Sequence, residues 1–72
     1  MKGNFFYKRL GARLICERKK RNLSQEQLSL MSHIDRTYLA RIEEGKANPT
    51  IKVLNKVSRV FKIKISQLIA GV

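Results

Sequence analysis

Cysteine, histidine and proline each occur only once in the chain. The single cysteine, Cys16, cannot form an internal disulfide, which fits a reducing cytosol. One cysteine and one histidine are too few to hold a zinc ion on their own. The only proline is Pro49, so no proline interrupts a helix in residues 1–48. These scarcities exclude a disulfide scaffold and a zinc-stabilised domain.

Acidic residues are scarce as well, with only five Asp and Glu. The chain has no Ser/His/Asp or Cys/His set at a recognisable spacing and no glycine-rich phosphate loop, so we expect no enzyme, cofactor or metal. No apolar run forms a secretory signal or approaches the ~20 residues of a membrane span. We therefore expect a cytoplasmic protein with no membrane contact and no small-molecule ligand.

Positive charge is what the chain has in excess. Sixteen Lys and Arg give a net charge of +11. Such a field indicates a polyanionic partner, which could be a nucleic acid, an anionic membrane or an acidic protein. Solubility alone seldom needs so unequal a balance.

The length of 72 residues limits the chain to a single domain, residues 1–72. A chain of this size buries only ~60% of its unfolded surface, so its core is small. The apolar fraction of 43% is nevertheless close to that of folded proteins. A folded domain is therefore expected in preference to a disordered basic tail.

The apolar spacing predicts an all-α fold of five helices and no sheet. The expected helices run from about Phe5 to Lys20, from Ser24 to Met31 or Ser32, from Asp35 to Gly45, from Thr50 to about Phe61, and from about Ile65 to Ala70. The second, third and fourth begin with the N-cap residues Ser24, Asp35 and Thr50, and Ser24 and Gln27 form a capping box. Asn22 and Gly45 suit left-handed helix stops.

Inner faces follow from the helical period. Phe6, Leu10 and Leu14 share one face of the first helix. Ile34, Leu39 and Ile42 form the inner stripe of the third, and Ile51, Leu54, Val57 and Phe61 that of the fourth. Lys52, Lys56 and Arg59 are expected on the outer face of the fourth helix.

The second and third expected helices suggest a function. They are short, each has its own N-cap, and a tight turn at Ser32, His33 and Ile34 joins them. This is the layout of a DNA-binding helix-turn-helix, whose second helix presents polar side chains to the major groove. The outward residues there are Arg36, Thr37, Ala40, Arg41 and Glu44. From spacing alone, a solvated helix face with ordinary charges is an equal alternative.

The chemistry of these residues suits base reading. Arginine can bind guanine O6 and N7 together, threonine offers a hydroxyl and a methyl group, and Ala40 is small enough for close approach. Gln25 sits at a helix N-terminus, where free N–H groups favour a phosphate. Lys46 and Asn48 follow the reading helix and could contact the backbone on the other side of the groove.

The stretch from Leu10 to Ile69 resembles the Cro/CI (Xre-type) helix-turn-helix family, through LSQEQL and YLARIEEGKANPT. The resemblance implies a lambda-repressor-like DNA-binding domain with no enzymatic activity. More narrowly, IDRTYLARIE is similar to controller proteins of restriction-modification systems, which are short dimeric regulators. By position, Arg36 and Thr37 would read bases, and Gln25, Tyr38, Lys46 and Asn48 would hold the DNA backbone. Packing between helices is an equal alternative for Tyr38.

The resemblance also implies a buried ion pair between Arg18 and Glu43, with a weak surface pair as the alternative. Three residues depart from the family pattern. His33 and Lys62 stand where glycine is usual, and histidine at a positive φ is a costlier choice. Glu17 stands where an aliphatic residue is common, which puts the packing of the first helix there in question.

Apolar side chains near the C-terminus exceed what so small a core needs. They are Val53, Val60, Ile63, Ile65 and Ile69. An exposed apolar patch on a small domain suggests a partner, so we expect a homodimer through the end of the fourth helix and the fifth. Two reading helices ~34 Å apart would then meet a pseudo-palindromic double-stranded DNA operator.

Two other functions stay open. A phage repressor or an antitoxin would use the same surface in another genetic circuit. A basic module for RNA, anionic lipid or an acidic protein would bind without regard to DNA sequence and release at modest salt.

Overall fold

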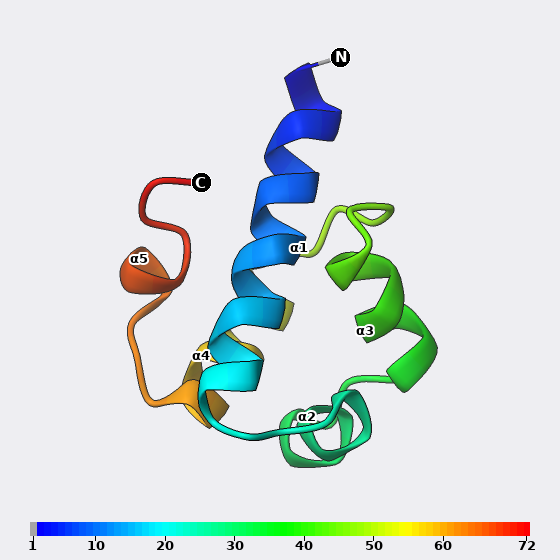
Figure 1. Cartoon of the computed structure of the whole chain (residues 1–72), viewed down its shortest axis with the longest axis vertical. Helices are drawn as coiled ribbons and strands as arrows, with labels where there is room; N and C mark the ends of the chain where they lie inside the picture. Colours follow the sequence, from blue (N-terminus) through cyan, green and yellow to red (C-terminus); the bar gives the residue numbers. More distant parts are fainter. Residues whose placement is uncertain (1) are drawn as a thin grey trace.

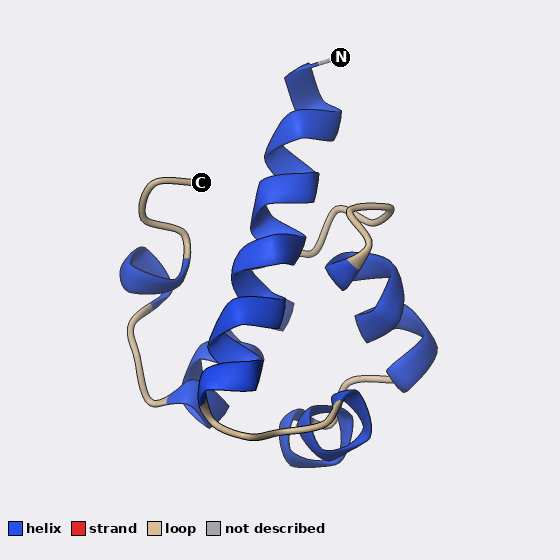
Figure 2. Cartoon of the chain, in the orientation of Figure 1, coloured by secondary structure: helices blue, strands red, loops and turns tan. Residues whose placement is uncertain are grey.

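The computed structural model describes the backbone of residues 2–72 and the side chains of residues 5–72. All regular structure in that range is helical (Figure 2). The helices are α1 (Lys2–Lys20), α2 (Gln25–Ser32), α3 (Arg36–Glu43), α4 (Ile51–Phe61) and α5 (Ile65–Leu68). The predicted all-α class with five helices is confirmed, although α1 begins earlier and α5 ends earlier than expected.

The long helix α1 is the axis of the domain, which measures 32 × 24 × 21 Å. Figure 1 shows α3 and α5 on opposite sides of α1, with α2 and α4 near its C-terminal end. Helix α3 packs on α1 and on α2, and α4 joins α2 to α5. One side of α3 is thereby held by the scaffold while its other side faces outward.

The core is a single cluster of apolar side chains drawn from all five helices and the turn between α2 and α3. Full burial of one such side chain contributes about 1.5–3 kcal/mol. The members are Leu10, Leu14, Leu28, Ile34, Leu39, Ile42, Leu54, Val57, Phe61 and Leu68. The predicted inner faces of α3 and of most of α4 are therefore confirmed.

The prediction that Phe6 and Ile51 face inward is wrong. Phe6 is 39% exposed, because α1 extends beyond the elements that pack on it (Figure 1) and Phe6 instead meets Tyr7 edge to face at 5.6 Å. Ile51 is 65% exposed. As the first residue of α4 it has a Cβ that points back past the helix end, away from the core. Periodicity alone does not show where a helix outruns its neighbours.

The expected N-caps are all present. Ser24 accepts from the Gln27 backbone N–H at 3.0 Å, and its own N–H donates to Gln27 Oε1 at 2.7 Å, which completes the capping box. Asp35 caps α3 through the Tyr38 N–H at 3.1 Å. Thr50 caps α4 through the Val53 N–H at 3.2 Å. Each cap is worth ~1 kcal/mol.

A left-handed residue lies within three positions of the end of every helix. Asn22 (φ 56°) and Gly45 (φ 76°) take the left-handed conformation, as predicted. His33 (φ 60°) and Lys62 (φ 59°) do so too, at the positions where the family pattern has glycine. A non-glycine residue held there costs ~1–2 kcal/mol. The surrounding packing must therefore impose the turns after α2 and α4.

Gly11 allows the close contact between α1 and α3. A Cβ built on Gly11 would lie 2.5 Å from the carbonyl oxygens of Ile42 and Glu43. No side chain can move aside to relieve that overlap, because both neighbours are backbone atoms. Glycine inside a helix ordinarily costs ~1 kcal/mol relative to alanine, and here it is the residue that lets the helices meet.

Arg13 explains why α5 is short. Its guanidinium donates to the carbonyls of Gln67 and Leu68, both at 3.2 Å, and of Ala70 at 2.6 Å. These side-chain bonds replace the helical hydrogen bonds that would continue α5, and Gly71 then turns the chain at φ 76°. Helix α5 is thus fastened to the middle of α1.

Glu17, the residue that departs from the family pattern, belongs to a polar link between α1 and α4. Arg21 donates to Glu17 Oε1 at 2.7 Å and to the Phe61 carbonyl at 3.0 and 3.2 Å. The same guanidinium lies 4.6 Å from the centre of the Phe61 ring. Glu17 therefore positions the arginine that closes the end of α4, so a charged contact stands where the resemblance led us to expect an aliphatic one.

The Glu17 link predicts a pH-dependent stability. The hydrogen bond from Arg21, together with Lys20, lowers the pKa of Glu17, although burial opposes the shift. The ionised form therefore stabilises the fold above the unfolded pKa of about 4.3, and this contribution is lost as the pH falls through the lower folded pKa. We expect Glu17→Gln to lose about 0.5–1 kcal/mol of unfolding free energy at neutral pH.

Urea unfolding of wild type and Glu17→Gln across the acidic range measures this difference. The two proteins should converge once Glu17 is protonated. A Glu44→Gln variant, which alters a carboxylate that is 57% exposed, is the control and should match wild type throughout. A wild-type advantage that persisted unchanged into strong acid would contradict a role for the Glu17 charge.

Candidate nucleic-acid interface

The turn between α2 and α3 is fixed by buried hydrogen bonds. Ser29 Oγ donates to the Ile34 carbonyl at 2.5 Å, and the Ile34 N–H donates to the Ser29 carbonyl at 3.2 Å. Ser32 Oγ donates to the Leu28 carbonyl at 2.6 Å. Both serines and Ile34 are buried. This turn sets the angle between the helices, and sequence reasoning placed Ser32 in it without predicting its hydrogen bond and did not mention Ser29.

Helix α3 divides cleanly into two faces. Leu39 and Ile42 are buried, while Arg36, Thr37 and Arg41 are exposed. Ala40 is half-buried between the exposed positions. Arg36 and Thr37 occupy the first turn, directly after the Asp35 cap, so they protrude at the N-terminal end of the helix. An outward N-terminal turn of this kind can enter a major groove.

Neither arginine of this face is deeply engaged within the protein. Arg36 Nη1 lies 3.8 Å from Glu26 Oε1, and both side chains are mostly exposed. Surface pairs of this kind contribute about 0–1 kcal/mol, so Arg36 is free to exchange partners. Arg41 Nη2 donates to the Lys46 carbonyl at 3.0 Å, which turns it towards the loop after α3. Arg36 is therefore the better placed of the two for a base.

The residues expected to contact the DNA backbone differ in how exposed they are. Lys46 and Asn48 are exposed on the loop between α3 and α4. With Tyr7 and Lys8 of α1 they line a groove of about 510 Å³, which sequence reasoning did not predict. Tyr38 is half-buried and packs against the core, as its alternative reading had it.

Gln25 has a partner inside the protein. Its Nε2 donates to Glu43 Oε1 at 3.0 Å, so the side chain braces α2 against α3. The backbone N–H groups at this helix start still point outward from the first turn.

Arg18 and Glu43 form the ion pair that the resemblance implied. Arg18 Nε and Nη2 donate to the two carboxylate oxygens of Glu43 at 2.8 and 3.1 Å. The side chains are only 12% and 3% exposed. Arg18 Nη1 also donates to the Leu23 carbonyl at 2.9 Å. The pair joins α1, the start of α2 and the end of α3, and so sets the orientation of α3.

The apolar residues expected at a dimer interface are all half-buried. Val53, Val60, Ile63 and Ile69 pack against the core of their own chain, and Ile65 is the only one of the set that does not. The most exposed large apolar side chains lie elsewhere, at Phe5, Leu30, Met31 and Ile51. The surplus of apolar surface near the C-terminus is therefore smaller than the sequence suggested.

No helix in the described part of the chain is both long and apolar enough to cross a membrane. Among the same residues, no cluster of His, Cys, Asp or Glu has the arrangement of a metal site.

The fold and the exposed end of α3 define a helix-turn-helix protein. The family model for the helix-turn-helix proteins designated HTH_3 matches residues 17–68. The chain belongs to this family of Xre-type helix-turn-helix regulators. The Cro/CI resemblance predicted from the sequence is thereby confirmed.

Individual relatives share most of this chain. Control protein C.MunI of a Mycoplasma species is 38% identical over 65 residues, which cover 89% of this chain and 88% of that protein. The immunity repressor protein of Bacillus phage phi105 is 35% identical over 60 residues, which cover 83% of this chain but only 42% of the repressor. The crystal structure of the restriction-modification controller protein C.AhdI from Aeromonas hydrophila has a TM-score of 0.83 at 31% identity, covering 86% of this chain and 94% of that one.

Proposed function

We propose that this regulator reads a specific operator in double-stranded DNA through the first turn of α3. The observation that carries the proposal is the exposure of Arg36 and Thr37 on a helix that the buried Arg18–Glu43 pair fixes to the scaffold. A rigid support matters, because base hydrogen bonds discriminate only when the donors are held in place. Ala40 and Arg41 complete the proposed base-reading face.

The proposed backbone contacts flank that face. Lys46 and Asn48 are exposed after α3, and the start of α2 offers the Gln25 N–H group. Tyr38 stays in this set as a proposal, although its packing against the core limits its reach. Contacts of this type position the protein and make its affinity fall with salt, without carrying sequence information.

We further propose that two copies bind together to a pseudo-palindromic operator. The interface would be formed by the end of α4 and by α5, through Val53, Val60, Ile63, Ile65 and Ile69. Arg13 supports this arrangement, because it fixes α5 to α1 and so relates any interface on α5 to the reading helix α3. Symmetry of the protein would then be mirrored by symmetry of the DNA.

Control of restriction-modification genes is the genetic role that we favour. Two proteins named as controllers match this chain over nearly their whole length, whereas the phage repressor extends well beyond the matched part. A phage repressor remains the second candidate because of its 35% identity. Neighbouring genes decide between them: a methyltransferase with an endonuclease supports the first, and an integrase supports the second.

Selection of bound duplexes from a random DNA pool tests the proposed function. We expect an inverted repeat whose half-sites lie about one helical turn apart, ~10–10.5 base pairs or a multiple of it. Sedimentation of the complex should give two chains for each site. A pool with no consensus would refute base reading and favour the sequence-blind basic module, and a single half-site carrying one chain would refute the dimer.

A further inference from the structure

A groove that takes no part in the proposed DNA contacts lies between the C-terminal end of α2 and the second half of α4. Its volume is about 500 Å³. It is lined by Met31, Ser32, His33, Lys56, Arg59, Val60 and Lys62. None of these residues is among those that we assign to bases or phosphates. The groove therefore presents a surface that the proposed base and phosphate contacts leave unused.

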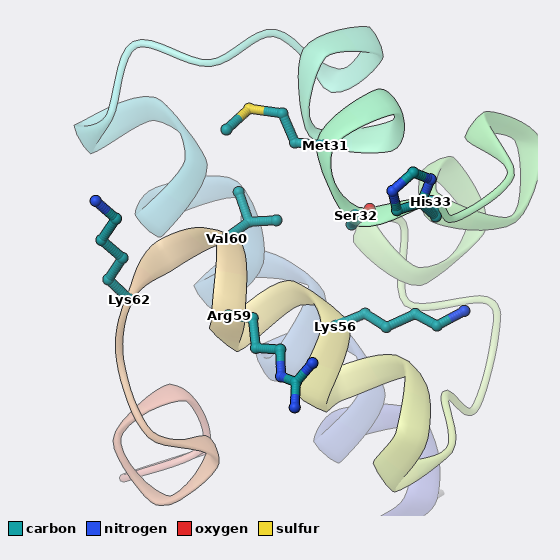
Figure 3. Close-up of a pocket in the computed structure, with 7 residues that line it drawn as sticks. All are labelled: Met31, Ser32, His33, Lys56, Arg59, Val60 and Lys62. Atoms are coloured by element: carbon teal, nitrogen blue, oxygen red, sulfur yellow. The ribbon is translucent and has the colours of Figure 1, made fainter.

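The floor of the groove is apolar. Figure 3 shows Met31 reaching from α2 over Val60 of α4, with the basic side chains spread around this pair. Met31 is 54% exposed although it is large and apolar. Methionine is flexible and polarisable, which suits a surface that adapts to a partner's apolar side chain. Covering these two apolar side chains with another apolar group is more favourable than leaving them in contact with water.

The charged side chains that line the groove are all cationic. Lys56, Arg59 and Lys62 surround the floor, and the lining includes no acidic residue. Among the described residues, the salt bridges of the domain involve none of these three. Their charges are therefore available to an anionic partner. The ligand that complements this groove has an apolar side chain flanked by carboxylates.

A second copy of this chain fits the groove poorly, although Val60 also belongs to the proposed dimer patch. A two-fold contact centred on the groove would bring the same lysines and arginine of each copy towards one another, and like charges in an interface are costly. The chain has only five acidic residues, and Glu17 and Glu43 already pair within the domain. With a net charge of +11, the other copy would bring far more positive than negative charge to such a contact.

A nucleic acid would neutralise the three cationic side chains of the groove but would leave its apolar residues without an apolar partner. Phosphates bind positively charged surfaces through charge alone and gain nothing from Met31 and Val60. We propose that the groove binds an acidic, amphipathic segment of a different protein. Apolar side chains of that segment lie on Met31 and Val60, and its carboxylates pair with Lys56, Arg59 and Lys62. Base reading by Arg36 and partner binding at the groove use different residues, so either can fail without the other, and Val60 is the one groove residue shared with the proposed dimer patch.

Titration of the isotope-labelled full chain with a synthetic peptide, followed by amide NMR, tests the inference. The probe alternates Leu and Phe with Asp and Glu. One comparison peptide replaces its Leu and Phe with Ser, and a single-stranded oligonucleotide of equal charge is the second comparison. We expect shifts centred on the groove residues and clearly tighter binding of the amphipathic peptide than of either comparison ligand.

Matched variants locate the contact. Lys56→Glu/Arg59→Glu should weaken the amphipathic peptide about tenfold or more, and Met31→Ser should weaken it as well. Lys19→Glu/Lys52→Glu makes the same change in net charge at exposed sites outside the groove and should weaken it much less. Equal losses in the two double variants, or equal binding of the serine peptide or the oligonucleotide, would overturn the proposal. Dissociation of a dimer by Met31→Ser would assign the groove to a second copy instead.

Discussion

An Arg18→Met variant is expected to lose about 3–5 kcal/mol of the free energy of unfolding. The substitution keeps most of the aliphatic stem but leaves the Glu43 carboxylate, which is 3% exposed, without its charged partner. A domain of this size has only a few kcal/mol of stability in total. Much of the variant should therefore be unfolded at physiological temperature, and what remains folded should hold α3 less firmly.

Urea unfolding monitored by circular dichroism measures this loss. The double variant Arg18→Met/Glu43→Leu removes both charges, so it should recover much of the stability lost by Arg18→Met. Arg36→Met breaks the 3.8 Å surface pair with Glu26 and should cost less than about 1 kcal/mol. If Arg18→Met were no more costly than Arg36→Met, the buried pair would not be what fixes α3 to α1.

Loss of the Arg36 guanidinium is expected to weaken operator binding by about 1–3 kcal/mol and to relax specificity at one base pair. Arg36 is exposed in the first turn of α3, and its only ion pair is a weak surface contact. Its side chain can therefore bind DNA without loss of an interaction that stabilises the fold. Arg36→Ala should therefore stay as stable as wild type while discriminating less between operator variants. Affinities for the selected operator and its single-base variants measure both effects.

Lys46→Ala is the matched comparison for Arg36→Ala. Lys46 is exposed on the loop after α3 and is proposed to touch phosphates only. Its loss should weaken all sequences alike and reduce the slope of log affinity against log salt by about 1. If the two variants lost affinity in the same way and without regard to sequence, Arg36 would be another backbone contact and not a base reader.

Features that depend on neighbouring residues were predictable from the sequence. The three N-caps at Ser24, Asp35 and Thr50 and the stops at Asn22 and Gly45 follow from local chemistry, and the structure has each of them. Buried positions followed from helical spacing wherever a helix has a neighbour along its length. The spacing failed at Phe6 and Ile51, because it does not tell where that neighbour ends.

Contacts between distant parts of the chain were not predictable from local patterns. Arg13 and Arg21 close the ends of α5 and α4 by donating to carbonyl groups that lie 57 and 40 residues further along the chain. In the sequence they look like ordinary surface charge. The Arg18–Glu43 pair came from the family resemblance and not from spacing. Part of the high positive charge therefore supports the fold, and only the remainder is free for a polyanion.

The polar residues around α3 show the same limit at the candidate site. Gln25 and Arg41 have side chains that suit DNA, yet in the structure they bind Glu43 and the Lys46 carbonyl. A sequence lists donors and acceptors but not the partners that satisfy them within the domain. Arg36 and Thr37 are the positions where exposure and chemistry agree.

Replacing single guanines of the operator with 7-deazaguanine tests most directly whether α3 lies in the major groove with Arg36 on a base edge. The analogue removes the N7 acceptor, which only the major groove exposes, and leaves pairing intact. We expect one guanine in each half-site where the replacement weakens wild type by about 1 kcal/mol or more but does not weaken Arg36→Ala further. Equal losses for both proteins at every guanine, or no loss at any, would contradict base reading by Arg36.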